Sequence, residues 1–448
     1  MAEEAGLSPV HRIIATYSRA LEALGLGVPP LFVEKWGVAV HQALSSRARE
    51  FHTHQHVLEL VRDADAIETL AALYHDIVYV QVDLDVPAHY AELLRPLVQR
   101  DDKVPNGWRL LPHCGEDPTA RDVLHMFGCT PGQVLTPFTG LNELASGLVA
   151  AKELENVLTR EQILAVLACI EASIPFRDGE AVQLRDRLLS LGMKAEEVGV
   201  MARRATRLSN NDVGNFADPD PARFLDNTWK LLPETNPSLH TPTTYTIKEY
   251  RVALMKMERF LATLPPERVF HTWGGEPSPA EHEKRIAAAA TNISLAVRYM
   301  RAKLYSSTII EALAIESGGD GPLPYFIGGT PDGSGVPMKR LENFLPELPH
   351  VRDDMQDVVL RKLLLGGRAT ASSFDIAPSP IADFLYVTLG ESRLMKGFDE
   401  SRAFWDGTTS ARVFLALQPR EPLAAIAAAV SEMAPTRAAA IAELMKLL

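Results

Sequence analysis

Apolar residues along most of the chain recur at intervals of three and four, which places them on one face of an α-helix. This spacing predicts helices over residues 8–25, 141–154, 196–208 and 247–263, and a long amphipathic helix over 281–314. Alternation of apolar and polar residues, which marks a half-buried strand, rarely extends over four residues. We therefore expect an all-α fold.

Local signals predict where some of these helices begin and end. Thr159-Arg-Glu-Gln162 has the pattern of a capping box, and the apolar run that follows it ends before Pro175. The C-terminal segment 422–448 is rich in alanine and reads as helix with a break near Pro435. These signals predict a helix over about 160–174 and two helices at the C-terminus.

Two stretches rich in proline and glycine interrupt the helical pattern. The first, 265–280, predicts a division into an N-terminal helical domain, 1–270, and a C-terminal helical domain, 280–448. The second, 316–337, predicts a long irregular loop. Its segment 327–335 lacks the Gly-Lys-Ser/Thr ending of a P-loop, so it is interpreted as a turn.

Composition and charge limit the possible partners and the compartment. The 448 residues include 45 Lys and Arg against 57 Asp and Glu, a formal net charge of −12. A long nucleic acid is therefore not expected as a partner. The three cysteines form no CxxC pair, and the sequence shows neither a signal peptide nor an apolar run long enough to span a membrane. We expect a cytoplasmic protein without a membrane partner.

Histidine placement points to a chemical site near the N-terminus. Two helices are expected over 53–80 with a break near Asp63–Asp65; on a helix, His52 and His56 share one face while His54 points elsewhere. His75 and Asp76 are predicted to form a polar pair inside an apolar helix. Because an unpaired buried carboxylate is costly, this pair suggests a neighbouring cation.

The two motifs FHTHQHV and ALYHDIVY resemble those of the HD superfamily of metal-dependent phosphohydrolases, including the cyclic-nucleotide phosphodiesterases. The resemblance implies an HD-type helical bundle that holds a divalent metal, Mg, Mn, Fe or Zn. It implies His56, His75 and Asp76 as ligands, and a later aspartate, for which Asp212 is the best match, as the fourth.

The same resemblance implies hydrolysis of a phosphoester, such as a nucleotide or cyclic-nucleotide phosphodiester, by a metal-activated water. Asp76 then serves catalysis as well as metal binding, and His52, once protonated, donates to the leaving oxygen. Arg177, Arg204 and Arg207 are candidate contacts to the substrate phosphate, because arginine matches phosphate geometry.

Several alternatives remain open from the sequence. The domain could be a non-catalytic nucleotide sensor or scaffold derived from the HD fold, or an HD-type di-iron oxygenase. A second metal would draw on Asp83, the preferred candidate, or on Asp85, His89, His113 or His125. The alanine-rich helices could also pack in a homo-oligomer or within one chain.

Overall fold

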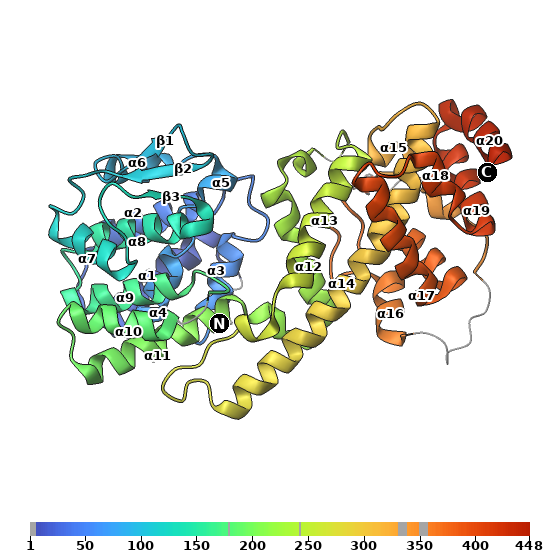
Figure 1. The fold of residues 1–448 in the computed structure, drawn as a ribbon. Coiled ribbons are helices and arrows are strands. Elements are labelled where there is room, and N and C mark those ends of the chain that lie inside the picture. Colours follow the sequence, from blue (N-terminus) through green and yellow to red (C-terminus); the bar gives the residue numbers. More distant parts are fainter. Residues whose placement is uncertain (1–5, 178–179, 242, 330–337, 349–356) are drawn as a thin grey trace. The chain divides into compact units, whose positions relative to one another are not determined.

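The computed structural model describes residues 6–177, 180–241, 243–329, 338–348 and 357–448. The described chain is mostly helical, which confirms the all-α fold (Figure 1). It divides into two compact units that interleave along the sequence. Unit 1 comprises Met1–Ala217 and Pro265–Ala289, and unit 2 comprises Asp218–Leu264 and Ala290–Leu448. The predicted division at 270–280 falls within the second stretch of unit 1.

Unit 1 carries the helices and strands of the N-terminal half of the chain. They are α1 (Pro9–Ala23), α2 (Pro30–Ala43), α3 (His54–Leu60), α4 (Ala66–Tyr74), α5 (Val80–Asp83), α6 (Ala88–Leu94), β1 (Val98–Asp101), β2 (Gly107–Leu110), α7 (Pro118–Met126), β3 (Val134–Leu135), α8 (Leu141–Leu154), α9 (Arg160–Ala172), α10 (Glu180–Ser190) and α11 (Ala195–Asp212).

Helix α9 lies at the centre of unit 1. Every residue from Ile163 to Glu171 is buried, as expected for a helix that is apolar on all faces. It packs against α4, α8 and α11. Its predicted capping box is present: Gln162 N–H donates to the Thr159 hydroxyl, and Thr159 N–H donates to the Gln162 side chain. This core holds α4 and α11, whose C-terminal ends carry His75 and Asp212.

A small antiparallel sheet was not predicted from the sequence. Its order is β1-β2-β3, and Val98 pairs with Leu110 while Trp108 pairs with Leu135 (Figure 1). The strands have only four, four and two residues, too short for an alternating pattern to stand out. The sheet leaves the predominantly helical character of unit 1 unchanged.

Unit 2 is built from the remaining helices. They are α12 (Pro221–Thr235), α13 (Ile247–Thr263), α15 (Leu323–Ile327), α16 (Val358–Gly366), α17 (Pro380–Trp405), α18 (Ala411–Ala416), α19 (Arg420–Met433) and α20 (Ala438–Leu447), together with most of α14 (Pro279–Glu316). Helix α17 is interrupted at Gly390, whose φ of 72° is readily adopted by glycine because it has no side chain.

Several predicted helices agree closely with the structure. Helices α8 and α13 match their predicted ranges, α14 extends the predicted long helix slightly, and α19 and α20 flank the predicted break at Pro435. The irregular loop expected over 316–337 contains the short helix α15, which corrects that prediction; residues 330–337 lie outside the described residues. None of the described helices is both long enough and apolar enough to cross a lipid bilayer.

Candidate metal centre

Four predicted ligands come together in unit 1 from three elements. His56 lies in the first turn of α3, His75 caps the C-terminus of α4 with Asp76 after it, and Asp212 is the last residue of α11. One ligand atom from each lies within 4.8 Å of those of the others. Residues separated by 156 positions thus form one compact group of imidazoles and carboxylates.

The shortest distances in this group join imidazole nitrogens to carboxylate oxygens. His56 Nε2 lies 2.9 Å from Asp212 Oδ1 and 4.0 Å from Asp76 Oδ2. His75 Nε2 lies 2.9 Å from Asp76 Oδ2 and 3.4 Å from Asp212 Oδ1. His75 is almost fully buried, whereas the other three side chains are 13–16% exposed. The group is therefore open to solvent on one side.

The ring of His75 is set up to coordinate a cation. Its Nδ1 lies 2.8 Å from the carbonyl oxygen of Ala72, a contact in which Nδ1–H donates, so Nε2 is the nitrogen that a metal would meet. Nε2 is buried and makes no well-oriented hydrogen bond within the described chain, although two carboxylate oxygens lie nearby. A backbone acceptor on the far nitrogen is the usual support of a metal-binding histidine. This orphaned nitrogen and the two carboxylates fit a divalent cation.

The electrostatics of the group also favour a cation. Burial opposes charge on these residues, but the carboxylates of Asp76 and Asp212 outweigh it and raise the pKa of His75 well above its ordinary value. In return, the histidines hold the pKa of Asp212 at about 2 and that of Asp76 well below its usual range, against the effect of burial. Both carboxylates are thus ionised near neutral pH and concentrate negative charge where a metal would bind.

His52 lies beside this group but not on the helix that carries His56. Helix α3 begins at His54 and Thr53 is its N-cap, so the prediction that His52 and His56 share a helical face is wrong. The two rings are nevertheless close, with centroids 6.2 Å apart, and the His52 ring also lies 4.6 Å from that of Tyr79. His52 therefore borders the candidate centre from the loop before α3.

The His-Asp pair likewise does not lie inside a helix. Helix α4 ends at Tyr74, and the chain turns through His75 and Asp76 before α5. Polar side chains of α8 hold the backbone after this turn: Ser146 Oγ accepts from Val78 N–H at 3.2 Å, and Asn142 Oδ1 accepts from Val80 N–H at 3.1 Å. Because the chain turns here, the side chains of His75 and Asp76 can both point toward Asp212.

Arg49 supports the centre and was missed by the sequence analysis. Its side chain is fully buried, and its guanidinium donates to the backbone carbonyls of Asp76 at 2.6 Å and of His52 at 3.4 Å. It also forms an ion pair with Asp83 in which the shortest N–O distance is 2.6 Å. Arg49 thus links the loop before α3, the turn after α4 and helix α5. The residues around Arg49 do not indicate this role, because a single arginine in a polar stretch is normally predicted to be exposed on the surface.

Glu143, in the first turn of α8, is a second residue that the sequence analysis missed. Its Oε2 is buried without a hydrogen-bond partner within the described chain. Burial, together with the negative charge of Asp76, raises the pKa of Glu143 to about 7. The charges of Arg177 and His75 also act on it. The place of Glu143 near the candidate centre could not be predicted from the sequence, because it follows from the packing of α8 against the turn after α4.

The three arginines predicted to bind phosphate each have protein partners. Arg177 donates to Glu171 Oε1 at 3.0 Å and to the Glu171 carbonyl at 2.8 Å. Arg204 binds Asp65 Oδ2 at 2.5 Å, and Arg207 binds Glu68 Oε1 at 2.7 Å. Their contact with a substrate stays a prediction. Arg204 and Arg207 form ion pairs with Asp65 and Glu68, which cap the N-terminus of α4.

The candidates for a second metal do not join the four-residue group. Asp83 is paired with Arg49, and Asp85 Oδ1 accepts from the N–H of Val86. His125 Nε2 lies 2.5 Å from the hydroxyl of Ser190. Within the described residues, the group close enough to hold a metal contains His56, His75, Asp76 and Asp212, without these residues or His89 and His113. The described residues therefore supply one group of four ligands, enough for a single ion.

Comparison with known proteins gives no relative: no family model, no curated protein and no solved structure matches the chain significantly.

Proposed function

We propose that unit 1 is a metal-dependent phosphohydrolase of the HD type. The observation that carries the proposal is the convergence of His56, His75, Asp76 and Asp212, whose ligand atoms lie within 4.8 Å of one another. Two imidazoles and two carboxylates suit Mn, Fe or Zn, and carboxylates with water also suit Mg. The resemblance of the two motifs to HD phosphohydrolases supports phosphoester hydrolysis, with a nucleotide or cyclic nucleotide as the substrate class.

Each residue has a distinct part in this proposal. A divalent ion, when bound, lowers the pKa of its water to about 7 and offsets charge on the phosphoryl oxygens. Asp76 and Asp212 keep the site anionic, and the carbonyl of Ala72 orients the His75 ring so that Nε2 faces the two carboxylates. His52, on the border of the group, is placed to donate a proton to the leaving oxygen, which contributes about 10²–10⁴-fold to such reactions.

The decisive experiment compares metal content and turnover in matched variants. The double variant His75→Ala/Asp76→Ala is expected to lose the metal after loading with Mn²⁺ and to lose hydrolysis of bis-p-nitrophenyl phosphate and of a panel of nucleotides. His54→Gln is the control, because His54 lies two residues from His56 but does not belong to the group. Unchanged metal content in the double variant would refute the metal centre.

His52→Gln separates catalysis from metal binding. This variant is expected to keep the metal and to lower kcat by about 10²–10⁴-fold, because it removes the proton donor and leaves the ligands. A metal that binds without turnover of any phosphoester in the wild-type protein would instead favour the non-catalytic nucleotide sensor.

A further inference from the structure

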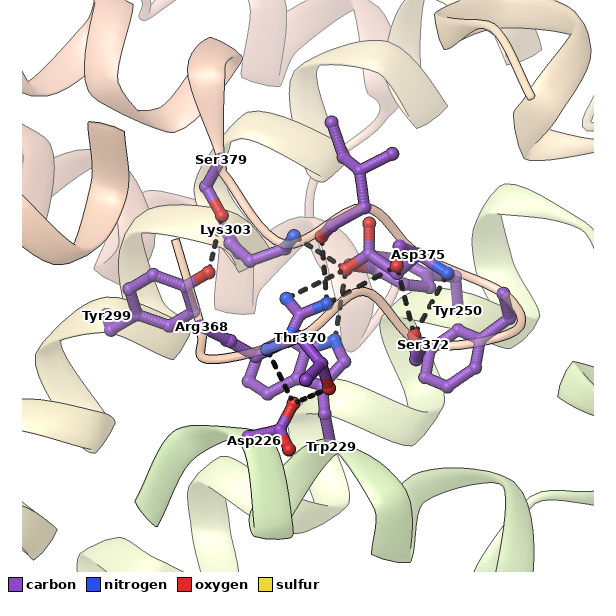
Figure 2. Close-up of polar contacts among 12 residues, drawn as sticks. Asp226, Trp229, Tyr250, Tyr299, Lys303, Arg368, Thr370, Ser372, Asp375 and Ser379 are labelled. Atoms are coloured by element: carbon purple, nitrogen blue, oxygen red, sulfur yellow. Dashed lines mark hydrogen bonds and ion pairs between the residues drawn. The ribbon is translucent and has the colours of Figure 1, made fainter. Parts of the chain in front are cut away.

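Unit 2 contains a buried polar cluster centred on Asp375 (Figure 2). Asp375 Oδ2 accepts hydrogen bonds from Lys303 Nζ at 2.7 Å, Tyr250 Oη at 2.8 Å and Trp229 Nε1 at 3.0 Å. Arg368 approaches the same oxygen at 3.4 Å. One carboxylate oxygen thus receives donors from three helices and a loop.

The charges of this cluster do not balance. Lys303 and Arg368 are cationic, and Asp375 is their one carboxylate partner in the described chain. The side chains of these three residues are 9%, 0% and 8% exposed. Asp226, also drawn in Figure 2, is bound to Thr370 and Lys230 instead. The cluster therefore holds one surplus positive charge away from water, which is costly without a counterion.

The two cations also have hydrogen-bonding capacity to spare. An ammonium group carries three N–H donors, yet Lys303 makes a single hydrogen bond, to Asp375, within the described chain. Arg368 Nε is buried and has no partner in the same residues. The Arg368 guanidinium lies 4.4 Å from the centre of the Trp229 ring, and Lys303 lies 5.4 Å from it. The aromatic face stabilises the cations but does not use their donors.

A pocket opens directly beside Lys303. Its cavity volume is about 50 Å³, and it is open to solvent on one side, so a longer ligand could extend outward from it. Lys303, Tyr250, Asp375 and Ser379 line one part of it. Eight of its fifteen lining residues are apolar: Ile310, Leu323, Ile327, Ile376, Pro378, Pro380, Ile381 and Ala382. A binding site for small molecules has this composition, an apolar wall with a few converging polar groups.

We propose that this pocket binds a small organic monoanion, a carboxylate with an apolar body. The single surplus charge matches one carboxylate, which would accept hydrogen bonds from the unused N–H groups of Lys303. Ser379 Oγ lies 2.7 Å from Tyr299 Oη, and when the tyrosine hydroxyl donates in this pair the O–H of Ser379 is a further donor for the ligand. The apolar body would lie against the isoleucine and proline wall. Inorganic phosphate lacks an apolar body and does not fit this wall.

Titration calorimetry on the full chain with octanoate, 1-octanol and inorganic phosphate tests the proposal. Octanoate is expected to bind with a Kd of about 1 mM or below, the range for a ligand of its size. The neutral 1-octanol is expected to bind at least about tenfold more weakly, because it lacks the charge that meets Lys303. Octanoate and 1-octanol binding equally well, or phosphate binding in place of octanoate, would overturn the proposed ligand class.

Variants locate the binding in this pocket. Lys303→Met is expected to weaken octanoate binding about tenfold or more. Lys230→Met is the matched control, because Lys230 also pairs with an aspartate, at 2.9 Å, but is 38% exposed and does not line the pocket. Ser307→Leu fills the pocket without a change of charge and is expected to abolish binding even if Lys303→Met fails to fold. Unchanged octanoate affinity in Ser307→Leu would refute the location.

Discussion

Burial changes the pKa of a single carboxyl group in unit 1, that of Glu153. Its Oε2 accepts a hydrogen bond from Tyr74 Oη at 2.9 Å. Burial outweighs that hydrogen bond and raises the pKa of Glu153 to about 7, from an ordinary value of 4.5. The folded protein thus holds this proton more tightly than the unfolded chain does. The resulting stability is complete below about pH 4.5 and is lost as the pH rises through about 7.

Glu153→Gln should remove this pH dependence. The free energy of unfolding of the variant, relative to wild type, is expected to rise by about 3 kcal/mol between pH 4.5 and pH 8, since 2.5 pKa units correspond to about that energy. Urea unfolding at both pH values measures it. Glu92→Gln is the control, because Glu92 is 84% exposed and should show no such trend. Parallel pH profiles for Glu153→Gln and wild type would contradict the assignment.

Short-range motifs explain which site residues could be predicted. The resemblance of two short motifs to the HD superfamily predicts His56, His75 and Asp76 as ligands, and Asp212, in a polar cluster that closes a helical run, is the best match to the later aspartate that the resemblance implies. Arg49 was not recognised, because its partners Asp76 and Asp83 lie 27 and 34 positions away and become visible only in three dimensions. The helical position predicted for His52 is wrong because Thr53 is the N-cap of α3 and the helix begins at His54.

Arg49 acts on several elements through one guanidinium group. Arg49→Met is expected to destabilise the protein by about 3–5 kcal/mol, because it leaves Asp83 as an uncompensated charge that is only 11% exposed. It should also weaken metal binding by about 10–100-fold, since it frees the turn that carries Asp76. Chemical denaturation and a metal titration measure the two effects.

An exposed ion pair provides the comparison for Arg49. Arg95→Met breaks the pair with Glu92, in which both side chains are more than 70% exposed, and should change stability by at most about 1 kcal/mol. Equal effects of Arg49→Met and Arg95→Met would show that Arg49 does not link these segments.

A substitution of Arg207 can show whether the arginines of α11 stabilise the fold or bind the substrate phosphate. It pairs with Glu68, whose side chain is 4% exposed and which forms a capping box with Asp65 at the start of α4. Arg207→Met is expected to lower the free energy of unfolding by about 1–3 kcal/mol with KM unchanged. A raised KM at unchanged stability would support the phosphate-binding role instead.

Helices with long apolar patterns and end signals were the elements that sequence analysis placed well. Helices α8, α9 and α13 combine regular apolar spacing with buried faces, and α9 and α13 also have capping boxes. Short elements such as α5 and the three strands are positioned by their neighbours rather than by their own pattern. Whether and where such short elements form depends on tertiary packing.

At the scale of the molecule, each unit is assembled from two separate stretches of chain. A fragment of residues 280–448 would lack Trp229 and Tyr250, which donate to Asp375. We expect it to show no cooperative unfolding transition by circular dichroism, whereas a fragment of residues 218–448, which contains all of unit 2, should show one. A cooperative transition in the shorter fragment would contradict this division.

The composition of the chain could not reveal this interleaving. Proline and glycine over 265–280 indicate a connection, but they do not say to which unit the connected residues belong. The backbone of His271 exchanges two hydrogen bonds of 2.8 Å with the side chain of Asn210, so this stretch returns to unit 1. A pairing across 61 positions leaves no mark in local sequence.

The Asp375 cluster has a consequence for the order of folding in unit 2. Its donors Trp229, Tyr250 and Lys303 lie 146, 125 and 72 positions before the aspartate in the chain. Bringing such distant positions together costs loop entropy before any contact compensates for it, whereas helices such as α13 close only local contacts. The helices of unit 2 should therefore form first and the aspartate should be enclosed last. Substitutions of Asp375 should accelerate unfolding and leave the folding rate almost unchanged.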